Sequence, residues 1–355
     1  MIRFALIGCG RIAPKHAGNL TEGMIGGASL VAVCDNKPER ARAFGEKYRV
    51  PFFTDMHDMM RVMGGQIDVI SILTPSGDHA EHTVQMSKYG KAIVVEKPMA
   101  LTLSDADRMI AACDKNGARL FVVKQNRFNL PVQKLFEALE QGRFGKLVMG
   151  TVRVRWCRTQ EYYDQDPWRG TWEHDGGVFA NQAIHHVDLL NWVMGDVESV
   201  FAKSTRALVN IEAEDTGVVI LKFKNGALGI IEATTATRPK DLEGSISVLG
   251  EKGTVEIGGF AVNEMKIWNF VEPLPGDQDV VSNYKVNPPN VYGFGHTEYL
   301  NDVVQALKTG KAAMVQGLEG RKSLELVTAI YESIETGKEV QVRFTPRQCR
   351  LGLKS

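Results

Sequence analysis

The chain lacks an excess of either charge and any long apolar run, and each absence argues against a class of protein. Lysine plus arginine and aspartate plus glutamate both number 42 in 355 residues, so the formal net charge is zero. Proteins that bind nucleic acid or membrane surfaces normally carry a basic surplus or block. No apolar stretch approaches the roughly 20 residues that span a bilayer. We therefore expect neither nucleic acid nor a membrane among the partners.

The cysteines also lack a pattern. All five stand apart, with no CxxC pair and no spacing typical of zinc ligands. Such an odd, scattered set favours a reducing compartment over a disulfide framework. The opening residues MIRFALIGCGRIA have neither the basic start nor the long apolar core of a signal peptide. These features together predict a cytoplasmic protein.

The first third of the chain alternates short apolar runs with amphipathic stretches. Runs that are apolar on both faces, each followed by a helix, predict a parallel sheet covered by helices. Right-handed crossovers then give a doubly wound α/β domain of the Rossmann type, which we place at residues 1–123. The expected strands are 2–7, 30–34, 69–73, 92–95 and 120–123, and the expected helices include 38–48, 77–89 and 104–115.

After an expected helix at 132–141, apolar and polar residues alternate strictly, and turn sequences separate the runs. This pattern predicts an α+β domain with a large, mostly antiparallel, open-faced sheet at residues 124–355. Because the open face needs cover, we expect a homo-oligomer, a dimer or tetramer formed through it. The expected strands are 147–156, 216–223, 227–234, 245–249, 254–257 and 265–270, followed by helices at 297–307 and 318–334.

The first candidate binding site is the GxGxxA pattern at residues 8–13, directly after the first expected strand. In such a pattern Gly8 permits a tight turn, Gly10 lets the backbone approach a pyrophosphate, and Ala13 allows close helix packing. The helix N-terminus then faces the anion. Asp35 ends the next strand, where a carboxylate accepts hydrogen bonds from the ribose of NAD and repels the extra phosphate of NADP. The pattern therefore predicts an NAD site.

Two further clusters carry candidate chemistry. Lys97, in the sequence Glu96-Lys97-Pro98, follows the strand at 92–95, and ligands of doubly wound sheets bind at the carboxyl ends of the strands. Asn181, His185 and Asp188 are spaced to share one face of a helix. His186 would lie on another face, where packing or simple exposure is expected. Metal-ligand spacings are absent around this histidine pair, so we expect no metal.

Together these features resemble the glucose–fructose oxidoreductase / inositol dehydrogenase / MocA family over essentially the whole chain. The resemblance rests on the GxGxxA pattern, Thr74-Pro75, Glu96-Lys97-Pro98, the Asn181…His185…Asp188 segment and the stretch at 319–326. It implies a Rossmann domain, an open-faced sheet domain, and oxidation of a sugar or cyclitol carbon.

The same resemblance implies roles for single residues. Lys97 and His185 match the catalytic lysine and histidine of the family. Many members carry Asp where this chain has Asn181, and an amide cannot hold a negative charge that would raise the basicity of His185. The residues expected at the cofactor are Gly8, Gly10, Arg11, Ile12, Asp35, Asn36, Arg40, Thr74, Pro75, His79, Glu96, Lys97, Gln125, Trp168 and Arg169.

The most specific of these expectations concerns the substrate. The stretches ALIGCGRIAPKH and DPWRGTWEHDGG resemble the bacterial dehydrogenases of UDP-N-acetylglucosaminuronic acid, which oxidise the sugar 3-hydroxyl with NAD in surface-polysaccharide (lipopolysaccharide) biosynthesis. Arginine forks suit the diphosphate and the carboxylate of such a sugar nucleotide. Such forks are offered by Arg153 and Arg155 on one strand face and by Arg158 and Arg169 in the following loop. The alternative is that these arginines pair with acids across the sheet. The residues expected at the substrate are Lys97, Arg155, Arg158, Tyr163, Asn181, His185 and Tyr292.

Several functions remain open at this level. In the dehydrogenase hypothesis His185 takes the hydroxyl proton, while Lys97, as an ammonium, hydrogen-bonds the same oxygen. An inositol dehydrogenase or another sugar dehydrogenase of the family would use the same pair. An NAD-dependent glycoside hydrolase also begins by oxidising a sugar carbon. A non-catalytic NAD-sensing regulator needs the glycines and Asp35 but not a lysine–histidine pair, so the presence of both favours an enzyme.

Overall fold

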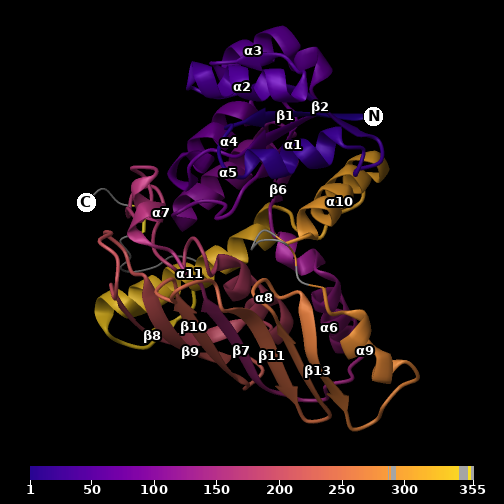
Figure 1. The fold of residues 1–355 in the computed structure, drawn as a ribbon, viewed down its shortest axis with the longest axis vertical. Helices are drawn as coiled ribbons and strands as arrows, with labels where there is room; N and C mark the ends of the chain where they lie inside the picture. The colour runs from indigo at the N-terminus through magenta and orange to yellow at the C-terminus, as the bar shows by residue number, and fades with distance from the viewer. Residues whose placement is uncertain (287, 289–292, 344–350, 353–355) are drawn as a thin grey trace. The chain divides into compact units, whose positions relative to one another are not determined.

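The computed structural model describes residues 1–286, 288, 293–343 and 351–352 (Figure 1). These residues form two compact units. Unit 1 contains Met1–Ala100, Ser104–Val123 and His296–Arg321, and unit 2 contains the remaining described residues. Within the described residues, no helix combines the length and the apolar character needed to cross a bilayer.

Unit 1 is built on a six-stranded parallel sheet with the order β3-β2-β1-β4-β5-β6. The order reverses between β1 and β4, which places a crevice at the carboxyl ends of the strands. The inner strands β4 and β5 are buried on both faces, as their mostly apolar sequences predict. The strands are β1 (Ile2–Ile7), β2 (Ala28–Cys34), β3 (Phe52–Phe53), β4 (Val69–Ile72), β5 (Ala92–Val95) and β6 (Leu120–Val122).

Helices flank this sheet in Figure 1. Proline stands in the first turn of α1 and α2, and Asp55 caps α3 by accepting the backbone N–H groups of His57 and Asp58. Thr297 at the start of α10 donates to Asn19 at the end of α1. The helices are α1 (Ala13–Thr21), α2 (Pro38–Tyr48), α3 (Met56–Met63), α4 (His79–Ser87), α5 (Leu103–Lys115) and α10 (Gly295–Thr309), with short 3₁₀ turns η1 (Gly64–Gln66) and η2 (Ser76–Asp78).

Unit 2 is built on an eight-stranded sheet with the order β13-β12-β11-β7-β10-β9-β8-β14. Its strand pairs are antiparallel except for the parallel pair of β7 and β10. The expected fold class, a Rossmann domain with a second domain built on a mostly antiparallel sheet, is confirmed. The strands are β7 (Leu147–Arg155), β8 (Val197–Thr205), β9 (Thr216–Phe223), β10 (Leu228–Thr234), β11 (Glu243–Gly250), β12 (Gly253–Gly258), β13 (Glu264–Phe270) and β14 (Val340–Gln341).

The two faces of this sheet differ. On one face α8 lies directly on β7, because a Cβ added at Gly150 would stand 2.6 Å from Met194. The other face exposes a row of apolar side chains, including Val218, Ile220 and Leu228. The helices are η3 (Gln125–Phe128), α6 (Leu130–Glu140), α7 (Gln160–Asp164), α8 (Ile184–Met194), α9 (Asp277–Asn283) and α11 (Gly317–Thr336).

The compact units differ from the expected consecutive domains in two respects, one of which is that Leu101–Leu103 belongs to unit 2. The expected domains and the compact units both divide the chain between Val123 and Lys124. His296–Arg321, however, belongs to unit 1, although the residues before it belong to unit 2. Arg119, at the entrance to β6, donates to the carbonyl oxygens of Ala306 and Lys311 and so ties this later segment to the sheet. No periodicity in the sequence reports such an attachment, because it depends on contacts between distant segments.

Candidate functional site

The glycine loop after β1 fits a dinucleotide. Gly8 has a φ of 98°, and a Cβ added there would stand 2.7 Å from the carbonyl oxygen of Leu73, so glycine is required. A Cβ added at Gly10 would meet no atom within 4 Å, which leaves the backbone approachable. Ile12, the N-cap of α1, makes no side-chain cap, and the backbone N–H groups of Ala13 and Lys15 donate to Gly10 and Ile12, so the start of α1 offers an anion the positive end of the helix dipole.

Asp35 links this loop to the next strand. Its Oδ2 accepts a hydrogen bond of 2.8 Å from the backbone N–H of Cys9, and Oδ1 accepts one of 2.9 Å from Lys37. The carboxylate therefore holds the glycine loop in place as well as standing at the end of β2, where a ribose is expected. Asn36 and Arg40, also expected at the cofactor, are exposed beside it.

His79 connects the loops that follow β4 and β5. Its Nδ1 lies 2.8 Å from the carbonyl oxygen of Pro98, and its Nε2 lies 2.9 Å from that of Thr74. Burial lowers the pKa of this histidine. Pro75, next to Thr74, is half-buried. His79 thus lies between the two loops at the carboxyl edge of the sheet, where as a neutral imidazole it donates a hydrogen bond to one of the two carbonyl oxygens, and a cofactor contact stays a prediction.

Glu96 lies in a buried group that the sequence did not reveal. His16 Nε2 donates to Glu96 Oε1 over 2.8 Å, and His296 Nε2 lies 3.7 Å from the same oxygen. Burial opposes ionisation of Glu96, but hydrogen bonding from His16 and then His296 outweighs it, and the pKa of Glu96 lies well below its usual value. Burial lowers the pKa of His296. A carboxylate is thus kept charged inside unit 1.

These three side chains are the one place in the described residues where three possible metal ligands converge. Two features favour a hydrogen-bonded group over a metal site. The separation of 2.8 Å between His16 and Glu96 is that of a hydrogen bond. Histidines that bind metals normally donate their other ring N–H, whereas Nδ1 of His16 and of His296 finds no acceptor within the described part of the chain. The absence of a bound metal stays a prediction.

Lys97 follows Glu96 directly and is half-buried. Glu96 Oε2 accepts a hydrogen bond of 3.1 Å from the backbone N–H of Lys97, so the buried carboxylate fixes the backbone that carries the lysine. The Lys97–Pro98 peptide is cis. Lys97 belongs to unit 1.

His185, the other expected catalytic residue, belongs to unit 2. It lies in the first turn of α8, and its Nε2 is 3.0 Å from Nε2 of Gln125 in η3. One turn later Asp188 binds Arg127 over 2.7 Å and Lys124 over 3.5 Å, all three side chains being buried. The segment that follows β6 therefore supplies the side chains that hold the N-terminal half of α8. Gln125, expected at the cofactor, is one of them.

One expectation about this segment is wrong. Asn181 was expected on the same helix as His185, but α8 begins at Ile184, and Asn181 lies in the turns before it. Glu214 accounts for the difference, because its backbone carbonyl accepts from Val178 and its side chain accepts from Phe179. The side chain of Asn181 donates to Asp175. His186 is fully buried against Trp156, with ring centroids 5.6 Å apart, as its expected packing role requires.

The arginines of β7 make pairs across the sheet. Arg155 bonds to Glu232 over 2.6 Å and to Glu243 over 3.2 Å, and Arg153 bonds to Glu243 over 3.3 Å. The cross-strand alternative therefore describes both side chains in the structure. A role for Arg155 in binding substrate stays a prediction. Arg158 pairs with Asp241 over 2.9 Å and lies over the ring of Trp156.

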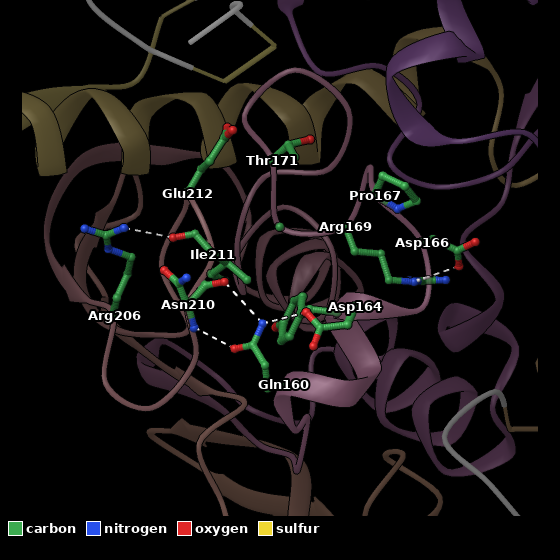
Figure 2. Close-up of a pocket in the computed structure, with 12 residues that line it drawn as sticks. Gln160, Asp164, Asp166, Pro167, Arg169, Thr171, Arg206, Asn210, Ile211 and Glu212 are labelled. Atoms are coloured by element: carbon green, nitrogen blue, oxygen red, sulfur yellow. Dashed lines mark hydrogen bonds and ion pairs between the residues drawn. The ribbon is translucent and has the colours of Figure 1, made fainter.

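A pocket of about 370 Å³ opens in unit 2 between the segment around α7 and the loop after β8 (Figure 2). Arg169 points along its wall, with Nε 3.2 Å from Asp166 and Nη1 2.9 Å from the hydroxyl of Tyr162. Its guanidinium also lies over the rings of Tyr162 and Trp168. Tyr163 lines the pocket while remaining largely buried. Figure 2 also shows Gln160 bridging Asp164 and Asn210 across the opening.

The remaining expected residues lie either at the start of α1 or outside the described residues. Arg11 is exposed and Ile12 half-buried at the start of α1. Tyr292, expected at the substrate, lies outside the described residues. Sequence reasoning missed His16, His296 and Glu214. A buried histidine in an amphipathic helix was a signal for His16, whereas His296 lies 280 positions further along the chain and gave none.

Comparison with known proteins decides the family. Residues 2–124 match the description "Oxidoreductase family, NAD-binding Rossmann fold", and residues 137–342 match "Oxidoreductase family, C-terminal alpha/beta domain", both of the GFO/IDH/MocA group. The chain belongs to the GFO/IDH/MocA family of oxidoreductases. It is an NAD-dependent sugar dehydrogenase of that family, so the expected family and cofactor are confirmed.

Three relatives illustrate the similarity. A solved WlbA dehydrogenase from Bordetella pertussis, in complex with NADH and UDP-GlcNAcA, is 45% identical with a TM-score of 0.90, over 96% of this chain and 98% of its own. The WlbA dehydrogenase from Chromobacterium violaceum, in a complex with the same two ligands, is 44% identical with a TM-score of 0.89, over 96% of each chain. A myo-inositol 2-dehydrogenase from Thermotoga maritima is 31% identical over 96% of this chain and 98% of its own.

Proposed function

We propose that this chain oxidises the 3-hydroxyl of UDP-N-acetylglucosaminuronic acid with NAD, in the biosynthesis of surface polysaccharide such as lipopolysaccharide. The observation that carries the proposal is the identity of 45% and 44% to the two WlbA dehydrogenases that were crystallised with UDP-GlcNAcA. That similarity extends over 96% of the chain and so includes both units.

Most of the residues expected at the cofactor belong to unit 1, while Gln125, Trp168 and Arg169 belong to unit 2. The open backbone at Gly10 and the uncapped start of α1 suit the pyrophosphate, and Asp35 suits the adenosine ribose. Hydride acceptance is the chemistry that NAD supplies when it is bound. The carboxyl ends of β4 and β5, where Thr74 and Glu96 stand, form the half of the crevice left for the nicotinamide.

Lys97 and His185 would share the work at the sugar hydroxyl. One accepts the hydroxyl proton, and the other donates a hydrogen bond to the oxygen as negative charge develops on it. Glu96 supports this by holding the Lys97 backbone, and Gln125 supports it by holding the His185 ring. The burial of Gln125, Arg127 and Asp188 keeps the support of His185 out of water.

The anionic groups of the substrate need cations, and its sugar and uracil need aromatic rings to lie against. Arg158, Arg169 and Tyr163 remain the candidates, together with Asn181 and the expected Tyr292. Arg169 is already oriented by Tyr162 and Trp168, which reduces the entropy lost when it binds an anion. Arg155 would have to exchange Glu232 or Glu243 for a substrate group, which makes it the weakest member of the set.

The second candidate function is an inositol dehydrogenase, which the identity of 31% to the Thermotoga maritima enzyme favours. Both candidates use the same lysine and histidine and differ in the substrate's charge. myo-Inositol carries no anionic group, whereas the UDP-uronate carries a diphosphate and a carboxylate. A non-catalytic NAD sensor is the less favoured alternative, because such a protein needs neither Lys97 nor His185.

The proposal also places the protein in the cytoplasm as a homo-oligomer. The four cysteines within the described residues are free thiols, which fits a reducing compartment. The apolar side chains on the open face of the unit 2 sheet suit a second copy of the chain.

An assay of NADH production tests the substrate. The rate should be high with the UDP-uronate and much lower with myo-inositol, free aldoses or UDP-N-acetylglucosamine, which lacks the carboxylate. Equal turnover of the UDP-sugar with and without its carboxylate would eliminate the uronate. Turnover of inositol alone would replace the proposal by its second candidate.

A further inference from the structure

Asp175 carries a carboxylate that is buried inside unit 2, with 1% of its surface exposed. Its Oδ2 accepts a hydrogen bond of 2.8 Å from the backbone N–H of Gly170, and its Oδ1 accepts one from the side-chain amide of Asn181. Because burying a carboxylate is costly, such a group needs these hydrogen bonds. They join the loop that carries Arg169 to the turns just before α8.

Residues that are expected at the substrate lie around this carboxylate. A Cβ added at Gly170 would stand 3.3 Å from the ring of Tyr163. Burial first, and the negative charge of Asp175 to a smaller extent, raise the pKa of Tyr163. Asp175 therefore lies beside the expected substrate residues Tyr163 and Asn181, but it is too deeply buried to meet a substrate itself.

The carboxylate determines how the amide of Asn181 is turned. An ionised carboxylate offers acceptors only, so Asn181 must present its NH₂ group to Asp175. The carbonyl oxygen of Asn181 then lies on the other side of the amide group. Asn181 is half-buried, and a carbonyl oxygen accepts up to two hydrogen bonds. This oxygen can therefore take a substrate donor in addition to any protein group.

We propose that Asp175 is a positioning residue, which turns the amide of Asn181 so that Asn181 meets the sugar as a hydrogen-bond acceptor. This rests on the proposed function, in which Asn181 binds the substrate. The group of the sugar that faces Asn181 is then a donor, either a hydroxyl or the N–H of the acetamido group, and not an anion. The same carboxylate holds the backbone next to Arg169, so one buried charge orders both segments.

Asp175→Asn should reverse the orientation of Asn181. The oxygen of the new amide stays on the N–H of Gly170, because a buried N–H without an acceptor is costly, and its NH₂ group then faces Asn181. Asn181 turns over to offer its oxygen to that group, and it presents a donor to the donor of the sugar. We expect kcat/KM to fall by about 10–100-fold, while the dissociation constant of NAD changes by less than about threefold.

Exchanging the two residues distinguishes orientation from simple loss of a charge. In the double variant Asp175→Asn/Asn181→Asp, the amide at position 175 donates to the carboxylate at position 181, whose second oxygen again faces the sugar. Its kcat/KM should return to within about fivefold of the wild type. A double variant no more active than Asp175→Asn, or an Asp175→Asn variant as active as the wild type, would overturn the proposal.

Glu137→Gln is the matched control for these variants. Glu137 also accepts a hydrogen bond from a side-chain amide, that of Gln141, but it lies exposed on α6. Its replacement removes the same charge from the same unit and should leave kcat/KM unchanged.

The orientation itself is measured without substrate, by NMR of the full protein with isotopically labelled asparagine. The side-chain signal of Asn181 is assigned by its loss in Asn181→Ser. A hydrogen bond to a carboxylate is stronger than one to water, so one amide proton of Asn181 should lie downfield of those of the exposed asparagines. In Asp175→Asn it should move back toward them, and in Glu137→Gln it should not move. A wild-type Asn181 signal among those of the exposed asparagines would overturn the proposal, even if Asp175→Asn fails to fold.

Because the NMR measurement needs no sugar, it distinguishes the inference from the proposed function. The kinetic comparison is made with whichever sugar the enzyme oxidises. Lack of turnover with every sugar nucleotide would remove the proposed function alone.

Discussion

His16 Nε2 donates a 2.8 Å hydrogen bond to Glu96 Oε1, and this bond joins α1 to the carboxyl end of β5 inside unit 1. The helix whose N-terminus suits a pyrophosphate is thereby tied to the residue that fixes the backbone of Lys97. His296, at the start of α10, approaches the same carboxylate. One buried charge therefore connects three segments that are distant in sequence.

Removing that charge should destabilise the protein. Glu96→Gln should lower the free energy of unfolding by about 1.5–3 kcal/mol at pH 7.5, the usual value of a hydrogen bond to a charged group. The pKa of Glu96 is held below its usual value, so its stabilisation is present above pH 4.5 and is lost as the pH falls further. The difference in free energy of unfolding between wild type and variant, measured by urea unfolding, should therefore become smaller at acid pH.

Glu81→Gln is the matched control, because Glu81 lies in the same unit with about half of its side chain exposed. Its effect should stay below about 1 kcal/mol. A Glu96→Gln variant as stable as Glu81→Gln at pH 7.5 would show that the buried group contributes nothing to folding.

Asp35 should have two separable effects on cofactor binding. Asp35→Asn keeps one oxygen for the backbone N–H of Cys9 but loses the negative charge, so it should bind NADP relatively better than the wild type does. Asp35→Ala also releases the glycine loop and should weaken the binding of both cofactors. Dissociation constants from fluorescence titration distinguish the two effects. An unchanged preference for NAD over NADP in both variants would contradict the role of this carboxylate.

Much of the fold was predictable because the relevant signals are local. The strand at 2–7, the helix at 38–48 and the strand at 216–223 appear with the expected bounds, since the first is a short apolar run and the other two have a clear period. The two-residue strand β3 offers too short a pattern to detect. Parallel pairing of β7 with β10 was not predictable, because alternation is the same whichever way a neighbouring strand runs.

The site was predictable where a motif carries the chemistry and obscure where it depends on packing. The glycine loop, Asp35 and Lys97 stand in local patterns with known purposes. The position of Asn181 depends on Glu214, more than thirty residues later, whose buried carboxylate takes the N–H of Phe179 and interrupts the start of α8. Contacts between residues so far apart in the chain do not change the local pattern of apolar and polar residues, so that pattern cannot predict them.

Glu214 should make stability depend on pH in the opposite sense to Glu96. Burial raises the pKa of its carboxyl to about 7 from 4.5, with the hydroxyl of Tyr331 3.0 Å from Oε1. The folded state then binds the proton more tightly than the unfolded state, so stability falls as the pH rises from 4.5 toward 7 and levels off above it. Glutamine does not titrate, so the free energy of unfolding of Glu214→Gln should not fall in this way. Relative to the wild type, it should rise by about 2–3 kcal/mol between pH 5 and pH 8.

Urea unfolding at several pH values measures the slope of the free energy of unfolding against pH. Glu198→Gln, at a carboxylate that is exposed in the same unit and paired with Lys222, should leave the slope unchanged. Parallel pH profiles for Glu214→Gln and the wild type would mean that Glu214 does not titrate in this range.

Lys97 should be indispensable for the chemical step and nearly irrelevant to cofactor affinity. Lys97→Met removes the amine, and Lys97→Arg replaces it by a group that stays protonated and so accepts no proton. Both should lower kcat by on the order of 10²-fold or more. The backbone N–H that Glu96 holds is unchanged in either variant, so the dissociation constant of NAD should hardly move. Activity near the wild-type level in Lys97→Arg would exclude the lysine as the base.

The open face of the unit 2 sheet should govern assembly. Ile220 on β9 is paired with Phe201 on β8 and Ile230 on β10, and 59% of its surface is exposed. An apolar row of this kind favours association with a second copy of the chain. A glutamate there would have to be desolvated at the interface, so Ile220→Glu should shift the mass measured by light scattering toward that of the protomer.

Val62→Glu provides the control, since Val62 on α3 of unit 1 is similarly exposed, at 56%. The charge it adds is the same, but Val62 is not part of the unit 2 sheet, so the substitution should leave the mass of the assembly unchanged. The ion pairs of Arg155 with Glu232 and Glu243 lie on the same face as Ile220 and can remain formed beside an interface. If Ile220→Glu and Val62→Glu have the same mass as the wild type, the copies associate through another surface or not at all.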